Sequence, residues 1–159
     1  MSGSPSARRV EDSRVDMTEL VMPGDANVLG NVFGGRVMAL IDKAAAMVGI
    51  RHCRSIVVTA SVDSIDFIAP IRLADIMSFH ARITQAFRTS LEVRVDVHCE
   101  DPRSGKRLLA TSAFATMVSL DSSGKPQPVP TLVLESDAER AEAAAADKRR
   151  ALRLARRGA

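Results

Sequence analysis

Two polar side chains stand where they could do chemistry: Asn27 in a glycine-punctuated loop, and Asp42 in the apolar segment that follows. Asp42 has no basic partner one helical turn away. The residues at those positions are Met38, Ala39, Ala45 and Ala46. A carboxylate in such surroundings can act as a general base or nucleophile, and an amide can orient water or a carbonyl group. The alternatives are an exposed Asp beside Lys43 and an Asn that only forms a turn.

A Gly34-Gly35 pair directly precedes the apolar segment. Bare backbone N–H groups at the positive end of a helix can bind an oxyanion or a carbonyl oxygen. The alternative is steric, because glycine also allows close packing or a positive φ. The surrounding sequence matches neither of the two common glycine-rich phosphate loops.

Arg88, Thr89 and Ser90 place one cation and two hydroxyls in a short turn between two expected strands. Such a set can contact a phosphate group, and the alternative is an ordinary exposed turn. We keep both interpretations at this point.

Other catalytic chemistries find little support in the residues. The three His are scattered, and no Ser stands in a nucleophile elbow. Cys53 and Cys99 lack a CxxC arrangement and a nearby His pair, so we interpret them as packing residues. We expect no metal site, no disulfide and no cofactor, in a protein of the reducing cytoplasm.

The composition indicates one globular domain with an unusual tail. The chain has 159 residues and a formal net charge of +3. Residues 148–159 carry six Lys and Arg and no acid, so the rest of the chain is net negative. Nucleic acid or anionic lipid could bind this tail, but it has no aromatic residue to stack on bases. We interpret it as part of a solvated helical extension, and no apolar run reaches the roughly 18 residues of a membrane span.

Apolar spacing predicts one long helix among five strands. The helix is expected over 36–50, where apolar residues cover most of the circumference. Strands are expected at 17–22, 55–68, 75–87, 91–100 and 107–120, and a charged helix at 135–157.

The segment 91–100 alternates apolar and polar residues without a fault, which predicts an antiparallel strand with one face on a core and His98 exposed to solvent. Short antiparallel links between the strands indicate an α+β fold whose sheet curls around the helix. We expect a disordered tail over 1–14, one domain over 15–130 and a charged helical extension over 131–159.

Several motifs resemble those of one known family. The pattern Met22-Pro23-x-Asp25-x-Asn27-x-x-Gly30-x-x-Phe33-Gly34-Gly35-x-x-Met38-x-x-Ile41-Asp42 is similar to the signature of hotdog-fold acyl-CoA thioesterases. The nearest branch is the bacterial acyl-CoA hydrolases related to the brain acyl-CoA hydrolase. The segment from Val57 to Pro70 resembles the second block of that branch, and the Arg-Thr-Ser turn and the segment from Asp121 to Pro126 also match. The resemblance covers about residues 17–130.

The resemblance implies a hotdog fold, in which an antiparallel sheet wraps a long central helix, here with a C-terminal helical extension. It also implies a homo-oligomer, a dimer paired edge to edge or a trimer of such dimers, with active sites at the dimer interface. The implied activity is that of an acyl-CoA thioester hydrolase (EC 3.1.2 class), which releases a free fatty acid and coenzyme A. Coenzyme A is then part of the substrate and product.

The resemblance also assigns roles to residues. Asp42 is the implied general base or nucleophile, Asn27 reaches it from the opposing subunit, and a backbone N–H near Gly35 holds the thioester oxygen. Arg88, Thr89 and Ser90 lie where relatives contact coenzyme A. This chain departs from some relatives by Val28-Leu29 after the Asn and by the bulky Phe87, instead of Gly, at the entrance of the turn.

Two other functions are compatible with the same fold. A non-catalytic acyl-CoA-binding sensor or regulatory protein would need no carboxylate beside the thioester, so Asn27 and Asp42 together favour hydrolysis. A hotdog dehydratase would need a catalytic His beside the helix, and the sequence places none there.

Overall fold

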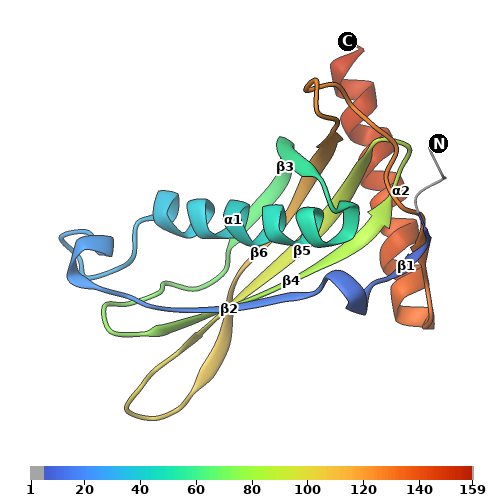
Figure 1. Ribbon diagram of the computed structural model, residues 1–159. Helices are drawn as coiled ribbons and strands as arrows, with labels where there is room; N and C mark the ends of the chain where they lie inside the picture. Colours follow the sequence, from blue (N-terminus) through green and yellow to red (C-terminus); the bar gives the residue numbers. More distant parts are fainter. Residues whose placement is uncertain (1–5, 159) are drawn as a thin grey trace.

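The computed structural model describes residues 6–158, whose main sheet is twisted and antiparallel and has a helix on each face (Figure 1). The strand order is β2-β4-β5-β6-β3. The strands are β2 (Val15–Leu20), β3 (Ile56–Phe67), β4 (Ile76–Ala86), β5 (Ser90–Glu100) and β6 (Arg107–Leu120). These five strands and the predicted α+β hotdog architecture are confirmed. Neither helix within residues 6–158 has the length and apolar character that a membrane crossing requires.

The long helix α1 (Gly34–Cys53) lies across one face of the sheet. Its buried side includes Val37, Leu40, Ile41, Ala44 and Val48, as helical spacing predicts. The helix ends where Arg54 takes a left-handed conformation, with φ of 55°, and donates its N–H to Ile50. The predicted helix at 36–50 is therefore confirmed and is longer at both ends.

A close approach between α1 and β3 depends on Gly49. A Cβ added there would lie 2.9 Å from the side chain of Val57, which real side chains do not tolerate. Glycine thus lets the helix pack directly on the edge strand, and the helix residues before it come to lie beside β3.

The central strand β5 shows the predicted alternation, but both of its faces are covered. Leu91, Val93, Val95 and Val97 are fully buried on the α1 side. On the opposite face Glu92 is also fully buried, and His98 is half-buried rather than exposed. The expectation of a solvent-facing polar side is therefore wrong, because a second helix packs there.

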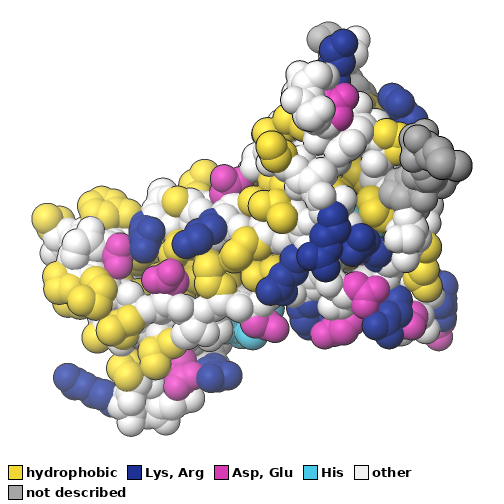
Figure 2. Space-filling model, viewed as in Figure 1, with side chains coloured by type: hydrophobic (Ala, Val, Ile, Leu, Met, Phe, Trp, Pro, Cys, Tyr) yellow, Lys and Arg dark blue, Asp and Glu magenta, His cyan; other side chains and the backbone are white. Residues whose placement is uncertain are grey.

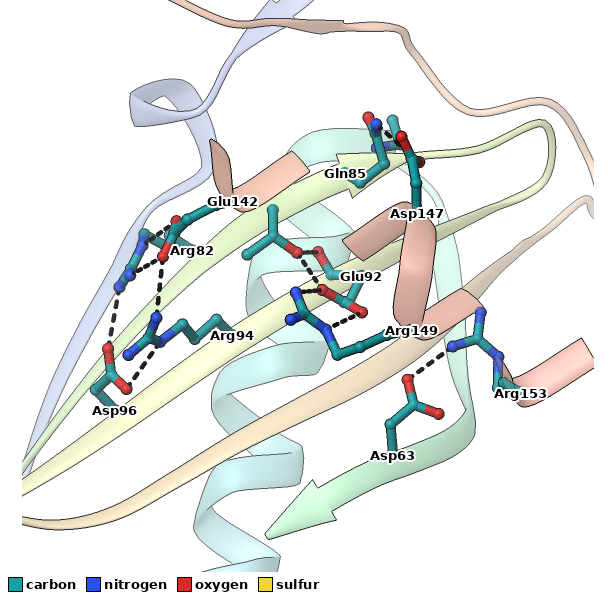
Figure 3. A network of polar contacts seen from close by, with 12 residues as sticks. Asp63, Arg82, Gln85, Glu92, Arg94, Asp96, Glu142, Asp147, Arg149 and Arg153 are labelled. Carbon is teal, nitrogen blue, oxygen red and sulfur yellow. Dashed lines mark hydrogen bonds and ion pairs between the residues drawn. The ribbon is translucent and has the colours of Figure 1, made fainter. Parts of the chain in front are cut away.

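That second helix is α2 (Asp137–Arg157), and it docks along the polar face of the sheet (Figure 3). It begins with a capping box of Ser136 and Glu139. Ala143 and Ala146 are buried where it touches the sheet. A solvated extension was expected because the helix has few large apolar residues, and the structure corrects this: small and charged side chains make the contact instead.

The expectation of disorder over 1–14 differs from the structure from residue 8 onward. The short strand β1 (Arg8–Arg9) pairs in parallel with β7 (Leu132–Val133), and a 3-10 turn, η1 (Glu11–Ser13), follows. Val10 is buried in the core. The order comes from a partner more than 100 residues away, which local composition does not reveal. Residues 1–5 of the expected tail lie outside the described residues.

Candidate active site

Asp42 lies on the exposed side of α1 and meets the edge strand β3. Its Oδ1 accepts a hydrogen bond of 2.5 Å from the Thr59 hydroxyl. Its Oδ2 has no hydrogen-bond partner within residues 6–158. One carboxylate oxygen is therefore held in place, while the other is available to take a proton or to attack a carbonyl carbon.

Thr59 is the part of this candidate site that sequence reasoning missed. It lies in the segment that resembles the second family block, but no role was derived for it. A register shift between Thr59 and Ser61 interrupts the pairing of β3 with β6, and such bulges typically re-aim side chains. Only the tertiary structure shows that Thr59 and Asp42, seventeen residues apart, form a pair.

Asn27 follows the 3-10 turn η2 (Pro23–Asp25) in the loop before α1. Its Oδ1 accepts hydrogen bonds from the N–H groups of Leu29 and Asn31, at 2.9 and 3.2 Å. This is the turn-forming role that was kept as an alternative. The side-chain Nδ2 makes no hydrogen bond within residues 6–158, so its two N–H donors remain available even though the oxygen is committed.

The loop is fastened at the N-terminal end of α1, away from Asp42. Phe33 donates its N–H to the Asp25 carbonyl at 2.9 Å, and Asp25 forms an ion pair with Arg36, also at 2.9 Å. Asp42 stands eight residues into the helix, about 12 Å along its axis. No hydrogen bond joins Asn27 to Asp42 within residues 6–158. Figure 1 shows the loop that carries Asn27 at the end of the molecule where α1 begins. One subunit alone does not bring the two residues together.

Gly34 and Gly35 occupy the first turn of α1, and their roles differ. A Cβ at Gly34 would lie 3.3 Å from the Phe67 ring, which supports the steric interpretation for this glycine. At Gly35 the space is open. Neither backbone N–H donates to any group in residues 6–158. The helix end therefore presents unused donors beside a cavity of about 320 Å³ lined by Asn31, Val32, Gly34, Val37, Phe67, Ile68, Ala69, Pro70 and Ile71.

Arg88, Thr89 and Ser90 lie in the β4–β5 hairpin, at the opposite end of the sheet from the Asn27 loop. Phe87 donates its N–H to the Ser90 carbonyl at 2.8 Å and closes the turn. The carbonyl of Thr89 accepts from Ser119, whereas the side chains of Arg88, Thr89 and Ser90 make no hydrogen bond among residues 6–158. The backbone holds the turn, and the side chains remain free to bind a ligand.

The remaining candidate nucleophiles are poorly suited to catalysis. Burial raises the pKa of the Cys53 and Cys99 thiols above their ordinary value, and the thiol form is a poor nucleophile. This agrees with their interpretation as packing residues. Residues 6–158 contain no group of three or more His, Cys, Asp or Glu side chains arranged to hold a metal ion.

Comparisons with known proteins place this site in context. The model of the thioesterase superfamily matches residues 29–106. The chain is 42% identical over 136 residues to an uncharacterized acyl-CoA thioester hydrolase of Bacillus subtilis, covering 86% of this chain and 79% of that protein. It is 41% identical over 140 residues to the cytosolic acyl coenzyme A thioester hydrolase of Mus musculus, but it spans only 36% of that protein's length.

Solved structures extend the likeness to the whole fold. An apo-hexameric acyl-CoA thioesterase superposes with a TM-score of 0.91 at 42% identity, covering 95% of this chain and 97% of that chain. An acyl-CoA hydrolase from Staphylococcus aureus, solved with butyryl coenzyme A and coenzyme A, gives 0.89 at 37% identity, covering 95% and 92% of the two chains. That hydrolase has also been solved as alanine variants of one Asn, one Asp and one Thr.

Proposed function

The chain belongs to the acyl-CoA thioester hydrolases of the thioesterase superfamily, and on that premise we propose that Asp42 and Asn27 hydrolyse acyl-CoA to a free fatty acid and coenzyme A. The observation that carries the assignment is the Thr59 hydroxyl held 2.5 Å from the Asp42 carboxylate. It orients a carboxylate whose second oxygen faces open space on the surface of α1.

Hydrolysis at this site needs a base and a way to stabilise charge. The free oxygen of Asp42 takes a proton from water as the water attacks the thioester carbonyl, or it attacks that carbon itself. The developing oxyanion is then stabilised by the N–H of Gly35 and the Nδ2 donors of Asn27, both at the N-terminal end of α1 in the opposing subunit, because within one subunit this end lies about 10 Å along the helix from Asp42. The C–S bond then breaks, and coenzyme A leaves as a thiolate that takes up the proton released by the attacking water. If Asp42 attacks directly, water hydrolyses the resulting acyl–carboxylate anhydride, which releases the fatty acid and restores Asp42.

Spacing in a relative supports these assignments. The alanine variants of the Staphylococcus aureus hydrolase alter an Asn, an Asp fifteen residues later and a Thr seventeen residues after that. Asn27, Asp42 and Thr59 stand at the same spacing in this chain.

The substrate has two parts, and one feature of the chain supports a proposed position for each. The apolar cavity beside Gly34, lined by Val37 and Phe67, suits an acyl chain. At the other end of the sheet, the free side chains of Arg88, Thr89 and Ser90 suit the phosphates of coenzyme A.

Because Asn27 and Asp42 are apart in one subunit, the complete site requires a second. The edge strand β3 pairs only on its β6 side within residues 6–158, and it exposes Ile56, Val58 and Val62. Two such edges can pair into one continuous sheet. The loop tip at Val28 and Leu29 is also exposed, and hydrophobic side chains gather over that end of the molecule (Figure 2). We therefore assign a dimer at least, with a trimer of dimers supported by the hexameric relatives.

A hydrolysis assay that traps released thiol tests the activity across acyl-CoAs of different chain length. Asp42→Asn should lower turnover by about 10²-fold or more while coenzyme A still binds. Asp137→Asn, the same change at a side chain fully exposed at the start of α2, serves as the control and should change little. Near wild-type turnover in Asp42→Asn would refute the assigned mechanism.

Subunit mixing tests whether the site is shared. Asp42→Asn and Asn27→Ala should each be inactive alone. Mixed dimers of the two variants contain one site with both substitutions and one site with neither, so activity should return after they are unfolded and refolded together. If both residues of a site belonged to one subunit, mixing would restore nothing.

A further inference from the structure

The α2 helix brings an arginine to the β4–β5 hairpin that sequence analysis did not connect with it. The guanidinium of Arg150 stacks over the Phe87 ring, with 4.7 Å between Cζ and the ring centroid. Phe87 directly precedes Arg88 in the turn. The bulky Phe87 at the turn entrance is thus covered by α2.

The path of α2 along the sheet explains the contact between Arg150 and Phe87. From its N-terminus onward the helix bonds Arg82 through Glu142, then Gln85 through Asp147 at 3.2 Å. Arg150 follows one turn later and reaches Phe87. Figure 3 shows the first two of these contacts, at Arg82 and at Gln85, following one another along β4. The basic half of the helix therefore arrives at the end of the sheet where the turn lies.

Arg150 differs from the arginines around it in having no carboxylate partner. Arg149 pairs with Glu92 at 2.8 Å, and Arg153 pairs with Asp63 at 2.7 Å. Within residues 6–158 neither Arg150 nor Arg88 forms an ion pair or a hydrogen bond through its side chain. Arg150 of α2 contacts the residue next to Arg88, so two arginines without an ion-pair partner in residues 6–158 meet the same hairpin.

Stacking makes Arg150 suitable for binding an anion. A guanidinium on an aromatic face is held by cation–π attraction, and its N–H edge remains free. That edge matches the oxygens of a phosphate in a two-pronged contact, which a lysine ammonium cannot make.

We propose that Arg150 and Arg88 together bind the phosphates at the nucleotide end of coenzyme A, so that α2 is part of the substrate site. This inference rests on the proposed function, because it takes acyl-CoA as the ligand. Phe87 then acts as the platform that holds the second arginine at the turn.

Calorimetric titration of the full chain with coenzyme A and with pantetheine, which lacks the nucleotide and its phosphates, tests the proposal. Arg150→Met keeps apolar contact with Phe87 but removes the charge and the donors. We expect it to weaken binding of coenzyme A by roughly tenfold, as loss of a charge-assisted hydrogen bond does, and to leave pantetheine affinity unchanged. Arg150→Lys should give an intermediate loss, because it keeps the charge without the planar fork.

Lys148→Met is the matched control. It removes one positive charge from the same stretch of α2, about 200° around the helix from Arg150, and should change coenzyme A affinity less than twofold. Equal effects of Lys148→Met and Arg150→Met, or equal losses on coenzyme A and pantetheine, would overturn the proposal. Because binding is measured without turnover, a wild-type chain that binds coenzyme A through Arg150 but hydrolyses nothing would refute the proposed function alone. Hydrolysis with a KM that is unaffected by Arg150→Met would refute this inference alone.

Discussion

On one face of the sheet, α1 packs against Phe79, Val93 and their neighbours, which are fully buried and apolar. On the other face, α2 packs against Arg82, Glu92 and Arg94 through charged partners (Figure 3). The first interface is stabilised by the removal of apolar surface from water, which needs no particular partner. The second must match each charge with an opposite one, because an unpaired buried charge is costly.

The charged face is a connected network. Arg82 and Arg94 both contact Glu142 and Asp96, at 2.6 to 3.2 Å. Burial by itself would raise the pKa of Asp96, but hydrogen bonds from Ser112 and Arg94 and the nearby positive charges outweigh it and hold the pKa below its ordinary value. The pKa of Glu142 is likewise lowered, because Arg82 and Arg94 outweigh its burial. The network thus keeps its carboxylates ionised inside an interface.

The largest effect is expected on the apolar face. Phe79→Ala should lower the free energy of unfolding by about 4 kcal/mol, because it leaves a cavity among close-packed residues. Chemical denaturation followed by far-UV circular dichroism measures this. A loss below about 1 kcal/mol would mean that this face can collapse around the missing ring, so that packing there is less specific than its burial suggests.

Removing one charged side chain from the other face should lower the free energy of unfolding slightly less. Glu92→Ala leaves the Arg149 guanidinium without its carboxylate and removes the shorter of two hydrogen bonds of the Thr84 hydroxyl, and we expect a loss of about 3 kcal/mol in the free energy of unfolding. The double variant Glu92→Met, Arg149→Met removes both charges and should recover most of that loss. If the double variant were as unstable as the single one, the pair itself would be a net source of stability.

Loss of the capping box should have a smaller effect. Ser136→Ala removes the side-chain acceptor of the Glu139 N–H at the start of α2, which should lower the free energy of unfolding by about 1 kcal/mol. Hydrogen exchange should show the loss concentrated in the first turns of α2. Uniform destabilisation of α1 and α2 would indicate that the two faces unfold as one unit.

The smallest expected effect concerns pH. Burial lowers the pKa of His52, whose Nε2–H donates to the Pro130 carbonyl at 2.9 Å. Below about pH 6.5 the His52 imidazole is protonated in the unfolded chain but stays neutral in the folded chain. The free energy of unfolding therefore falls as the pH falls through this range. The Asp96 and Glu142 carboxylates lose their contribution only near pH 4 and below. Denaturation midpoints between pH 7.5 and 5 should therefore fall less in His52→Gln than in the wild type, and an unchanged slope would contradict the assignment.

Sequence reasoning succeeded where the apolar residues of a single helix or strand repeat with the period of its backbone. Helical spacing around Leu40 and Ala44 predicted α1, and strict alternation from Leu91 onward predicted β5, because an apolar face must repeat with the period of its backbone. It also predicted the helix at 135–157, confirmed as α2, but it missed that this helix docks on the sheet, because the contacts use alanine and charge and therefore leave no apolar period. It also missed Thr59, because the sequence does not show that the Thr59 hydroxyl donates a hydrogen bond to Asp42.

By itself, the sequence determined the order of the elements, the apolar core and the residues able to do chemistry, since all of these follow from local spacing and residue type. The tertiary structure alone decided that Thr59 holds Asp42, that Asn27 lies too far away to reach it within one subunit, and that α2 brings Arg150 to the Arg88 turn. Each of these depends on segments distant in sequence meeting in space. Such meetings are set by the packing of whole helices and strands, which no short stretch of residues encodes.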